Sequence, residues 1–250
     1  LGNPEKLERS ESADIGLRAL VGKRQAIVSS SDINPDALDE LVERVVAMAK
    51  SVPEDPYCGL AEPDQLATKF VDVDSCDPSE PTTETLVDWA NRAEESARAI
   101  EGITNSEGAE AGWGRATVCV AATNGFAQTY SGSHYSLSAS VLAGEGTGME
   151  RDYDYTGAVY ADDLMSPEEV GTSAGEKAVK RLNPQKAETA QVPVIYDPRV
   201  SRGIVMHLAS AINGSSVARD TSFLKDKMGE QVFPAGTTIY DDPHRARGLR

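Results

Sequence analysis

The fold class of this 250-residue chain is decided by Arg115-Ala116-Thr117-Val118-Cys119-Val120-Ala121 and by the Asn124-Gly125 pair that follows it. The first segment is rich in β-branched residues, which is typical of a strand. Asn-Gly between two such runs predicts a two-residue hairpin, so Phe126–Ser131 is expected to return alongside. Residues 113–160 therefore predict an antiparallel sheet, with further strands at Tyr135–Ala143 and Arg151–Tyr160.

The glycine-rich segment 144–148 joins the last two of these expected strands. Glycine-rich loops can cradle phosphate, but this one lacks the Lys and Ser/Thr of a P-loop, and no helix follows it directly. The pattern favours a hairpin connection.

Amphipathic helices are predicted both before and after the sheet segment in the sequence. One begins after Asn34, a suitable N-cap, with Pro35 at its first position, and ends before Pro53. Another begins after Ser166, with Pro167 in its first turn. The chain is therefore predicted to be α+β, with antiparallel sheets and flanking helices. The remaining expected elements are helices at 84–101, 198–213 and 221–228, and strands at 192–196 and 236–240. Two short strands within 15–30 are expected about a Gly22-Lys23-Arg24 turn, and the helix at 198–213 is expected to end at Asn213-Gly214.

Proline placement divides the chain into two expected domains. Five prolines between residues 52 and 83 predict an irregular crossing or a linker. We expect an N-terminal α/β domain at 1–102, which contains this Pro-rich crossing 52–83, and a central α+β domain at 103–250. Because the chain begins with Leu1 and not with Met, we also expect a fragment of a longer polypeptide that is cut at both ends.

The composition limits the classes of function. The net charge is −16, from 40 acidic and 24 basic residues. Such a surface repels a phosphate backbone, which disfavours direct binding of nucleic acid. No run of about 18 apolar residues is present, so no membrane span is expected.

The cysteines indicate a reducing compartment. There are three, an odd number, and they form no CxxC pair, which favours a cytoplasmic protein with free thiols. Cys119 is expected in the core because it lies in an apolar strand. Cys58 and Cys76 lie in segments rich in proline and aspartate and are expected to be reduced loop thiols.

Candidate catalytic residues are few. The three histidines are far apart in the sequence, so there is no local cluster of metal ligands, and no nucleophile elbow is present. We expect His134 to be the exposed start of a strand, His207 to be packed or at an interface, and His244 to be solvated. Arg151 and Asp152 are the most distinctive charged residues, and a cross-strand surface pair is the favoured interpretation. The residues alone indicate no catalytic site.

Seven short segments are distinctive in their order and spacing: His134–Ser138, Met149–Tyr153, Ser166–Gly171, Ser215–Arg219, Thr221–Leu224, Met228–Val232 and Asp242–Leu249. Together they resemble the PmbA (TldE) branch of the TldD/PmbA metallopeptidase family, which also carries the label modulator of DNA gyrase. Weaker similarity runs from about Ile15 onward. Members of that family begin earlier and continue past residue 250, so the resemblance implies that this chain lacks its N-terminal part and its C-terminal domain.

The resemblance implies a lost metal site. In that family the TldD-type subunit carries HExxxH on a helix, where two imidazoles hold a metal and the glutamate acts as base. When the chain is aligned through Gly229–Val232, Val205 and Ser210 stand at the two histidine positions and Met206 at the glutamate. No metal and no cofactor are then expected in this chain, and zinc is expected in the partner subunit. The degenerate motif comprises Val205, Met206, His207, Leu208, Ala209 and Ser210.

The resemblance also implies a partner. It predicts a heterodimer with a TldD-type, metal-bearing subunit that acts on unfolded peptides, in which this chain contributes cavity wall and peptide docking, for example through sheet edges. Two alternatives stay open. One is a stand-alone homodimeric scaffold or binding protein without a proteolytic role. The other is an independent enzyme with a site around His134 and Arg151.

Overall fold

The computed structural model describes residues 4–249 and confirms the α+β class with antiparallel sheets and flanking helices. The chain divides into two compact units. The first comprises the chain up to Asn183 together with His244 onward, and the second comprises Pro184–Pro243. None of the described helices is long and apolar enough to cross a lipid bilayer.

The first unit begins with an antiparallel hairpin and a helix. β1 (Ile15–Val21) and β2 (Arg24–Ser30) pair as the sequence predicts, around a turn in which Gly22 has φ +61°. Glycine adopts this left-handed conformation without steric cost. α1 (Pro35–Ser51) packs on the hairpin, and the buried residues of this small core are Ala26, Val45 and Ala49.

Both ends of α1 match the sequence prediction. Asn34 is the N-cap residue with extended backbone, Pro35 opens the helix, and the helix ends before Pro53. The buried stripe of α1 is narrow, because Val42 is 48% exposed. The buried residues of α1 are Leu41, Val45 and Ala49.

A three-stranded antiparallel sheet forms the centre of the first unit. Its strands are β3 (Ile103–Ala121), β4 (Ala127–Ala143) and β5 (Glu150–Ala158), in the order β3-β4-β5. The loop 144–148 is the hairpin connection that the sequence predicts. Short 3₁₀ turns lie at Pro63–Gln65, Gly146–Gly148 and Ala161–Asp163.

Two strands are longer than the sequence predicts. β3 begins at Ile103 and not near residue 113, and the segments 126–131 and 135–143 form one strand, β4. Residues 104–112 include glycine and glutamate, which are depleted in strands. They pair with β4 through two register shifts, so cross-strand pairing overrides their local propensity.

The turn between β3 and β4 is also longer than predicted. The N–H of Ala122 donates to the carbonyl of Phe126 (2.8 Å), which closes a loop at 123–125. Gly125 has φ +94°, as expected for a three-residue hairpin loop that ends in a left-handed residue. The side chain of Asn124 donates to the carbonyl of Ala61 (3.0 Å) and accepts from the N–H of Phe126.

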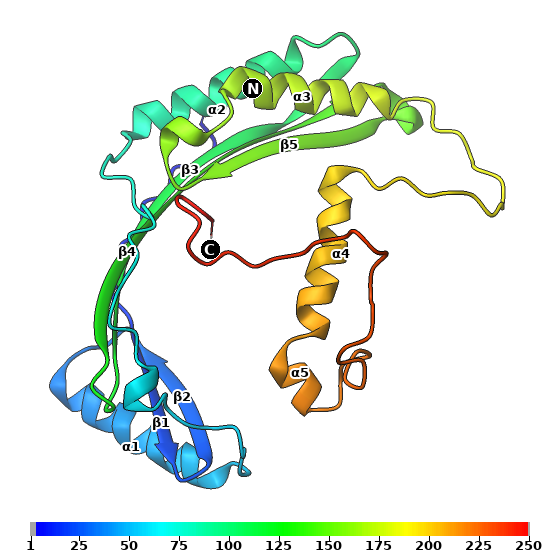
Figure 1. The fold of residues 1–250 in the computed structure, drawn as a ribbon. Coiled ribbons are helices and arrows are strands. Elements are labelled where there is room, and N and C mark those ends of the chain that lie inside the picture. The colour runs from blue at the N-terminus through cyan, green and yellow to red at the C-terminus, as the bar shows by residue number, and fades with distance from the viewer. Residues whose placement is uncertain (1–3, 250) are drawn as a thin grey trace. The chain divides into compact units, whose positions relative to one another are not determined.

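The outer part of this hairpin extends beyond the helices that cover the sheet (Figure 1). Residues 115–121 and 127–130 are exposed on both faces of the ribbon. Cys119 is therefore exposed, and the prediction that it lies in the core is wrong. Cys58 is buried and Cys76 half-buried, and all three thiols are free.

The Pro-rich crossing runs beside β4 and is packed against it. Beyond the end of β5, the N–H of Ser133 donates to the carbonyl of Ser75 (3.0 Å), and the Ser75 hydroxyl donates to the carbonyl of Ser131 (2.7 Å). The N–H of Asp77 donates to Oγ of Ser133 (2.7 Å). The crossing thus occupies the β5 side of β4 where β5 has ended.

Two helices, α2 (Thr83–Arg98) and α3 (Pro167–Lys180), lie side by side over one face of the sheet (Figure 1). α3 begins at the N-cap predicted at Ser166, which forms a capping box in which the Ser166 side chain accepts from the N–H of Glu169. α2 and β3 belong to one core, on either side of the expected border at residue 102. Its buried residues are Ala93, Ala97, Leu137, Ala139, Val141, Ala143, Val170, Ala174 and Ala178.

The second unit contains α4 (Pro198–Ala211) and α5 (Gly214–Ala218). Asn213 was expected to end the fourth helix, but its side chain accepts from the N–H of Ser215 and so begins α5. Within the described chain, three further predictions for this unit are wrong. The helix expected at 221–228 and the strands expected at 192–196 and 236–240 are turns and extended segments. Strands need a partner strand for their backbone hydrogen bonds, and the segments 192–196 and 236–240 pair with no described strand.

Candidate functional site

The region aligned with the metal-binding motif lies on α4. The helix is capped by Asp197, whose carboxylate accepts from the N–H of Arg199 (2.9 Å). Val205, Met206 and His207 are exposed on the second unit, so His207 is not packed in this unit as one prediction had it. The remaining motif positions are Leu208, which is half-buried, and Ala209 and Ser210, which are exposed.

These side chains do not fit the zinc that the resemblance implies for a hydrolytic subunit. A catalytic zinc is held by three protein ligands, usually imidazole and carboxylate groups. The motif positions on α4 offer one imidazole and no carboxylate. Among residues 4–249, no group of three or more His, Cys, Asp and Glu side chains is placed to hold a metal ion.

The other two histidines lie on other elements. His134 is exposed on β4, as expected, although it lies inside that strand and not at its start. A Cβ at Gly157 would lie 3.3 Å from Cε1 of His134, so the glycine leaves room for the imidazole on the neighbouring strand. His244 lies in the terminal loop and is exposed.

Arg151 and Asp152 have different partners. Arg151 forms an exposed ion pair with Glu107 (3.2 Å), which also accepts from the hydroxyl of Ser140 (2.8 Å). Asp152 is buried and accepts from Nε of Arg181 (2.6 Å). Successive side chains point to opposite faces of a strand, so a surface pair is correct for Arg151 and wrong for Asp152.

A second buried carboxylate repeats the arrangement of Asp152. Asp154 accepts from Nζ of Lys177 (2.7 Å), one helical turn before Arg181 on the same side of α3. Burial raises the pKa of Asp154. Hydrogen bonds from Lys177, Ser173 and the N–H of Tyr155 together lower this pKa by more than burial raises it, so it lies below its ordinary value. The two pairs join β5 to α3, and no local signal in the sequence brings these residues together.

A cluster of side chains around Arg247 holds residues 244–249 against the rest of the first unit. Arg247 stacks on the ring of Tyr160 (3.7 Å), and its Nε donates to the carboxylate of Asp74 (2.7 Å). Tyr160 also donates to Asp74, which raises the pKa of the phenol to about 12. The same two hydrogen bonds lower the pKa of Asp74. A further ion pair joins Arg247 to Asp163 (3.3 Å).

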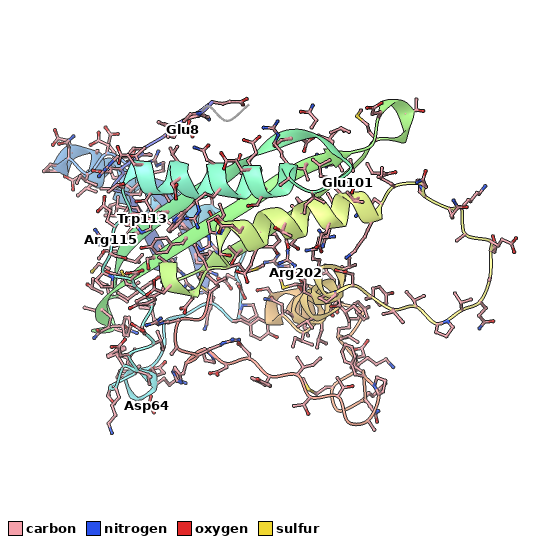
Figure 2. The ribbon with its side chains drawn as sticks, turned by 90° about the horizontal axis from the view of Figure 1, so that it is seen from above. Glu8, Asp64, Glu101, Trp113, Arg115 and Arg202 are labelled. Atoms are coloured by element: carbon pink, nitrogen blue, oxygen red, sulfur yellow. The ribbon has the colours of Figure 1, made fainter. Side chains whose placement is uncertain are left out.

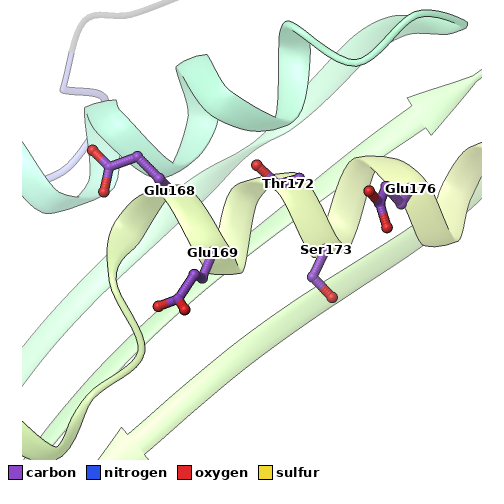
Figure 3. A pocket seen from close by; sticks show the side chains of 5 residues that line it. All are labelled: Glu168, Glu169, Thr172, Ser173 and Glu176. Carbon is purple, nitrogen blue, oxygen red and sulfur yellow. The ribbon is translucent and has the colours of Figure 1, made fainter.

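A shallow depression on α3 is lined by acidic and hydroxyl side chains (Figure 3). Glu168 pairs with Arg92 on α2 (2.8 Å), and Glu169 belongs to the capping box of α3. Their hydrogen bonds lower the pKa of both carboxyl groups. These contacts give both groups a structural role. The lining residues are Glu168, Glu169, Thr172, Ser173 and Glu176.

Three models of one protein family match successive parts of the chain. They describe PmbA/TldA metallopeptidase domain 1 (residues 1–49), the central domain (76–182) and the C-terminal domain (189–250). The third match assigns 189–250 to the C-terminal domain, whereas the sequence alone grouped these residues with the central domain.

Curated relatives are similar over nearly the whole chain. Metalloprotease PmbA of Escherichia coli O157:H7 is 34% identical over 249 residues, which are 99% of this chain and 55% of that protein. The PmbA homolog of Haemophilus influenzae is 36% identical over 246 residues, or 98% of this chain and 54% of the homolog. The chain thus spans about half the length of the curated relatives it matches.

Solved structures share the fold. A candidate modulator of DNA gyrase from Bacteroides thetaiotaomicron superposes with a TM-score of 0.86 at 24% identity, over 97% of this chain and 56% of that one. TldE from Thermococcus kodakarensis superposes with a TM-score of 0.66 at 19% identity, over 84% of this chain and 47% of that one. With three consecutive family domains and relatives similar along its length, the chain belongs to the PmbA/TldD metallopeptidase family.

Proposed function

We propose that this chain is a non-catalytic, PmbA/TldE-type subunit that acts with a TldD-type, metal-bearing subunit on unfolded peptides. One feature of the sequence supports the proposal: in the alignment through Gly229–Val232, Val205, Met206 and Ser210 of α4 correspond to the His, Glu and His of the family's peptidase motif. Apolar and hydroxyl side chains neither replace the imidazoles nor act as the base. The zinc is proposed to belong to the partner subunit.

The proposed contribution of this chain is cavity wall and peptide docking. An unfolded peptide can add a strand to an open sheet edge through main-chain hydrogen bonds, and the first unit has a three-stranded sheet with two outer strands. The net charge of −16 disfavours direct contact with DNA. We therefore propose that any effect on gyrase passes through peptides. The three cysteines, which form no CxxC pair, support the further proposal that the chain acts in the cytoplasm.

The test is hydrolysis of a fluorogenic, unstructured peptide by this chain, by a TldD-type subunit of the same organism, and by their mixture. We expect activity only where the TldD-type subunit is present, an increase of at least about tenfold on mixing, which corresponds to about 1.4 kcal/mol, and loss of activity with a zinc chelator. Co-elution of the two proteins should accompany the increase.

Matched variants separate the two subunits. Replacing the motif glutamate of the TldD-type subunit by Gln should abolish activity of the mixture, whereas Met206→Ala in this chain should leave it unchanged. Hydrolysis by this chain alone, resistant to chelator, would instead favour a site around His134 and Arg151. A chain that neither binds the TldD-type subunit nor raises its activity would favour the stand-alone scaffold.

A further inference from the structure

The two outer edges of the three-stranded sheet differ in chemistry. On β5, the N–H groups of Tyr153 and Tyr155 donate to the side-chain carboxylates of Asp152 (2.8 Å) and Asp154 (3.0 Å). Beyond the end of β5, residues 75–77 of the crossing bond to β4. The amides that an added strand would need on this side already have acceptors, so this side of the sheet is closed.

The backbone directions of β4 show which groups of β3 face outward. The N–H of Ser133 donates to the carbonyl of Ser75 on the β5 side, and the N–H of Gly144 donates to the carbonyl of Gly102 on the β3 side. Because backbone groups alternate along a strand, the even-numbered residues of β4 face β3. Their partners in the outer half of β3 are also even-numbered. The odd-numbered residues of this half therefore direct their N–H and C=O groups outward.

The outward backbone groups of β3 are open in the part of the chain that the structure describes. The amides of Arg115, Thr117 and Cys119 take part in none of the backbone hydrogen bonds outside the β3–β4 pairing. The Arg115 side chain pairs with Glu80 (3.6 Å) and lies over the ring of Trp113, 5.5 Å from its centroid (Figure 2). These contacts engage the side chain of Arg115 and leave the backbone of the edge open.

The open backbone groups favour an extended polypeptide as the occupant of this edge. A strand supplies alternating main-chain donors and acceptors at the spacing of the outward groups of β3. Natural proteins commonly close free edges, as this chain does on the β5 side. Apolar side chains exposed on one face of the β3–β4 ribbon offer contacts to the side chains of an added strand, namely Val118 (37%), Val120 (44%) and Tyr130 (59%).

Charge narrows the class of peptide. Residues 111–144 contain no aspartate and no glutamate, and Glu80 neutralises the Arg115 guanidinium, so the edge itself selects no charge. The electrostatic field of the whole chain then decides, and a net charge of −16 attracts cations and repels anions at long range. The same repulsion disfavours a second copy of this chain at the edge.

We propose that the outer edge of β3, at residues 115–121, is the docking site for an unfolded peptide without net negative charge, which adds to the sheet as a fourth strand. The peptide pairs with the outward backbone groups of Arg115, Thr117 and Cys119, and β5 takes no part. This site rests on the proposed function, which supplies the unfolded peptides, and it assigns peptide docking to one edge of the sheet. Main-chain hydrogen bonds carry no sequence information, so the site selects peptides by charge and by extended conformation.

The experiment measures binding of unstructured peptides to the chain, without a partner subunit, by fluorescence anisotropy. Two peptides of equal length carry the same neutral dye and net charges of about +4 and about −4. At low salt the cationic peptide should bind at least about tenfold more tightly than the anionic one. The ratio of the two affinities should shrink at about 0.5 M salt, because salt screens the field of the chain.

Matched proline variants locate the site. Thr117→Pro removes an outward N–H of β3 and should weaken binding of the cationic peptide about fivefold, which corresponds to one hydrogen bond of about 1 kcal/mol. Tyr153→Pro changes an outward residue of β5 in the same way and should leave the affinity within about twofold. Edge strands tolerate proline where the N–H faces outward. Near-ultraviolet circular dichroism of each variant reports whether the first unit remains folded.

A second measurement uses the unaltered chain and does not rely on proline. Saturation with the cationic peptide should slow hydrogen exchange of the Thr117 and Cys119 amides at least about tenfold, as nuclear magnetic resonance resolves them. The amides of Tyr153 and Tyr155 should exchange as before.

Four results overturn this inference: exchange slowed on β5 and not on β3, full binding by folded Thr117→Pro, equal affinity for the two peptides at low salt, or binding of neither peptide. The proposed function is judged separately, by hydrolysis in the mixture with the TldD-type subunit. A mixture that hydrolyses peptides while the β3 edge stays open would refute the docking site alone.

Discussion

At the scale of single residues, Asp154 has two roles because each of its carboxylate oxygens has a separate donor. One oxygen accepts from Lys177 of α3 and the other from the N–H of Tyr155. We expect Asp154→Ala to lower the free energy of unfolding of the first unit by about 1–3 kcal/mol, since it leaves a partly buried ammonium and an amide without their acceptor. Asp154→Asn keeps an acceptor for the amide and should cost less. Urea denaturation of both variants measures the difference.

The pH dependence of this pair has a definite sign. Because the pKa of Asp154 is lowered in the folded chain, the ionised group contributes stability above the pKa of the unfolded state, about 3.9, and the contribution is lost as pH falls further. The stability difference between the original chain and Asp154→Asn should therefore be constant near neutral pH and shrink below about pH 4. A difference that grew on acidification would contradict this assignment.

At the scale of secondary-structure elements, the close approach of α2 and α3 depends on two glycines. A Cβ on Gly171 would lie 2.0 Å from the carbonyl oxygen of Ala93, and a Cβ on Gly175 would lie 2.8 Å from that of Ala97. Neither backbone can move without displacing a helix. We expect Gly171→Ala to destabilise the first unit by about 1–3 kcal/mol through overpacking, despite the better helix propensity of alanine.

Glu176→Ala is the matched control on the same helix, because Glu176 is exposed. Its effect should stay within about 0.5 kcal/mol. Thermal unfolding monitored by circular dichroism compares the two variants. Equal stability of Gly171→Ala and the unaltered chain would mean that the two helices lie farther apart.

The sequence predicted those elements whose signals are local. Capping residues fixed the start of α3 at Ser166, and the turn at Gly22 fixed the first hairpin. It did not predict that β3 begins at Ile103, because glycine and glutamate are weak strand formers and the pairing comes from β4. Cys119 was misplaced because alternation cannot tell a covered strand from an exposed ribbon.

The same limit applies to the candidate site. The proposed replacement of the motif at Val205, Met206 and Ser210 rests on the sequence alone, because it depends on the identity of aligned residues. The partners of Asp152 and Asp154 could not, because α3 lies more than twenty positions further along the chain and only the packing of α3 on β5 brings the two bases there.

At the scale of the whole molecule, the boundary between the two units predicts where proteases act. Residues 184–197 are exposed and form neither helix nor strand, and such segments are cut first. We expect trypsin to cleave after Lys186 before it cleaves within residues 103–183, as mass spectrometry of early time points would show. Lys186→Gln should remove this early cut. Early cleavage at Lys177, which is paired with Asp154, would show that the first unit opens more readily than its packing implies.

The Arg247 cluster has a consequence for the order of events during synthesis. Asp74 and Tyr160 leave the ribosome long before Arg247, which pairs with Asp74 and stacks on Tyr160. At about 5–20 residues per second, Arg247 follows Asn183 by roughly 3–13 s. During this interval the first unit of the nascent chain lacks the guanidinium that contacts the Asp74 carboxylate and the Tyr160 ring. The rate of translation sets the length of the interval.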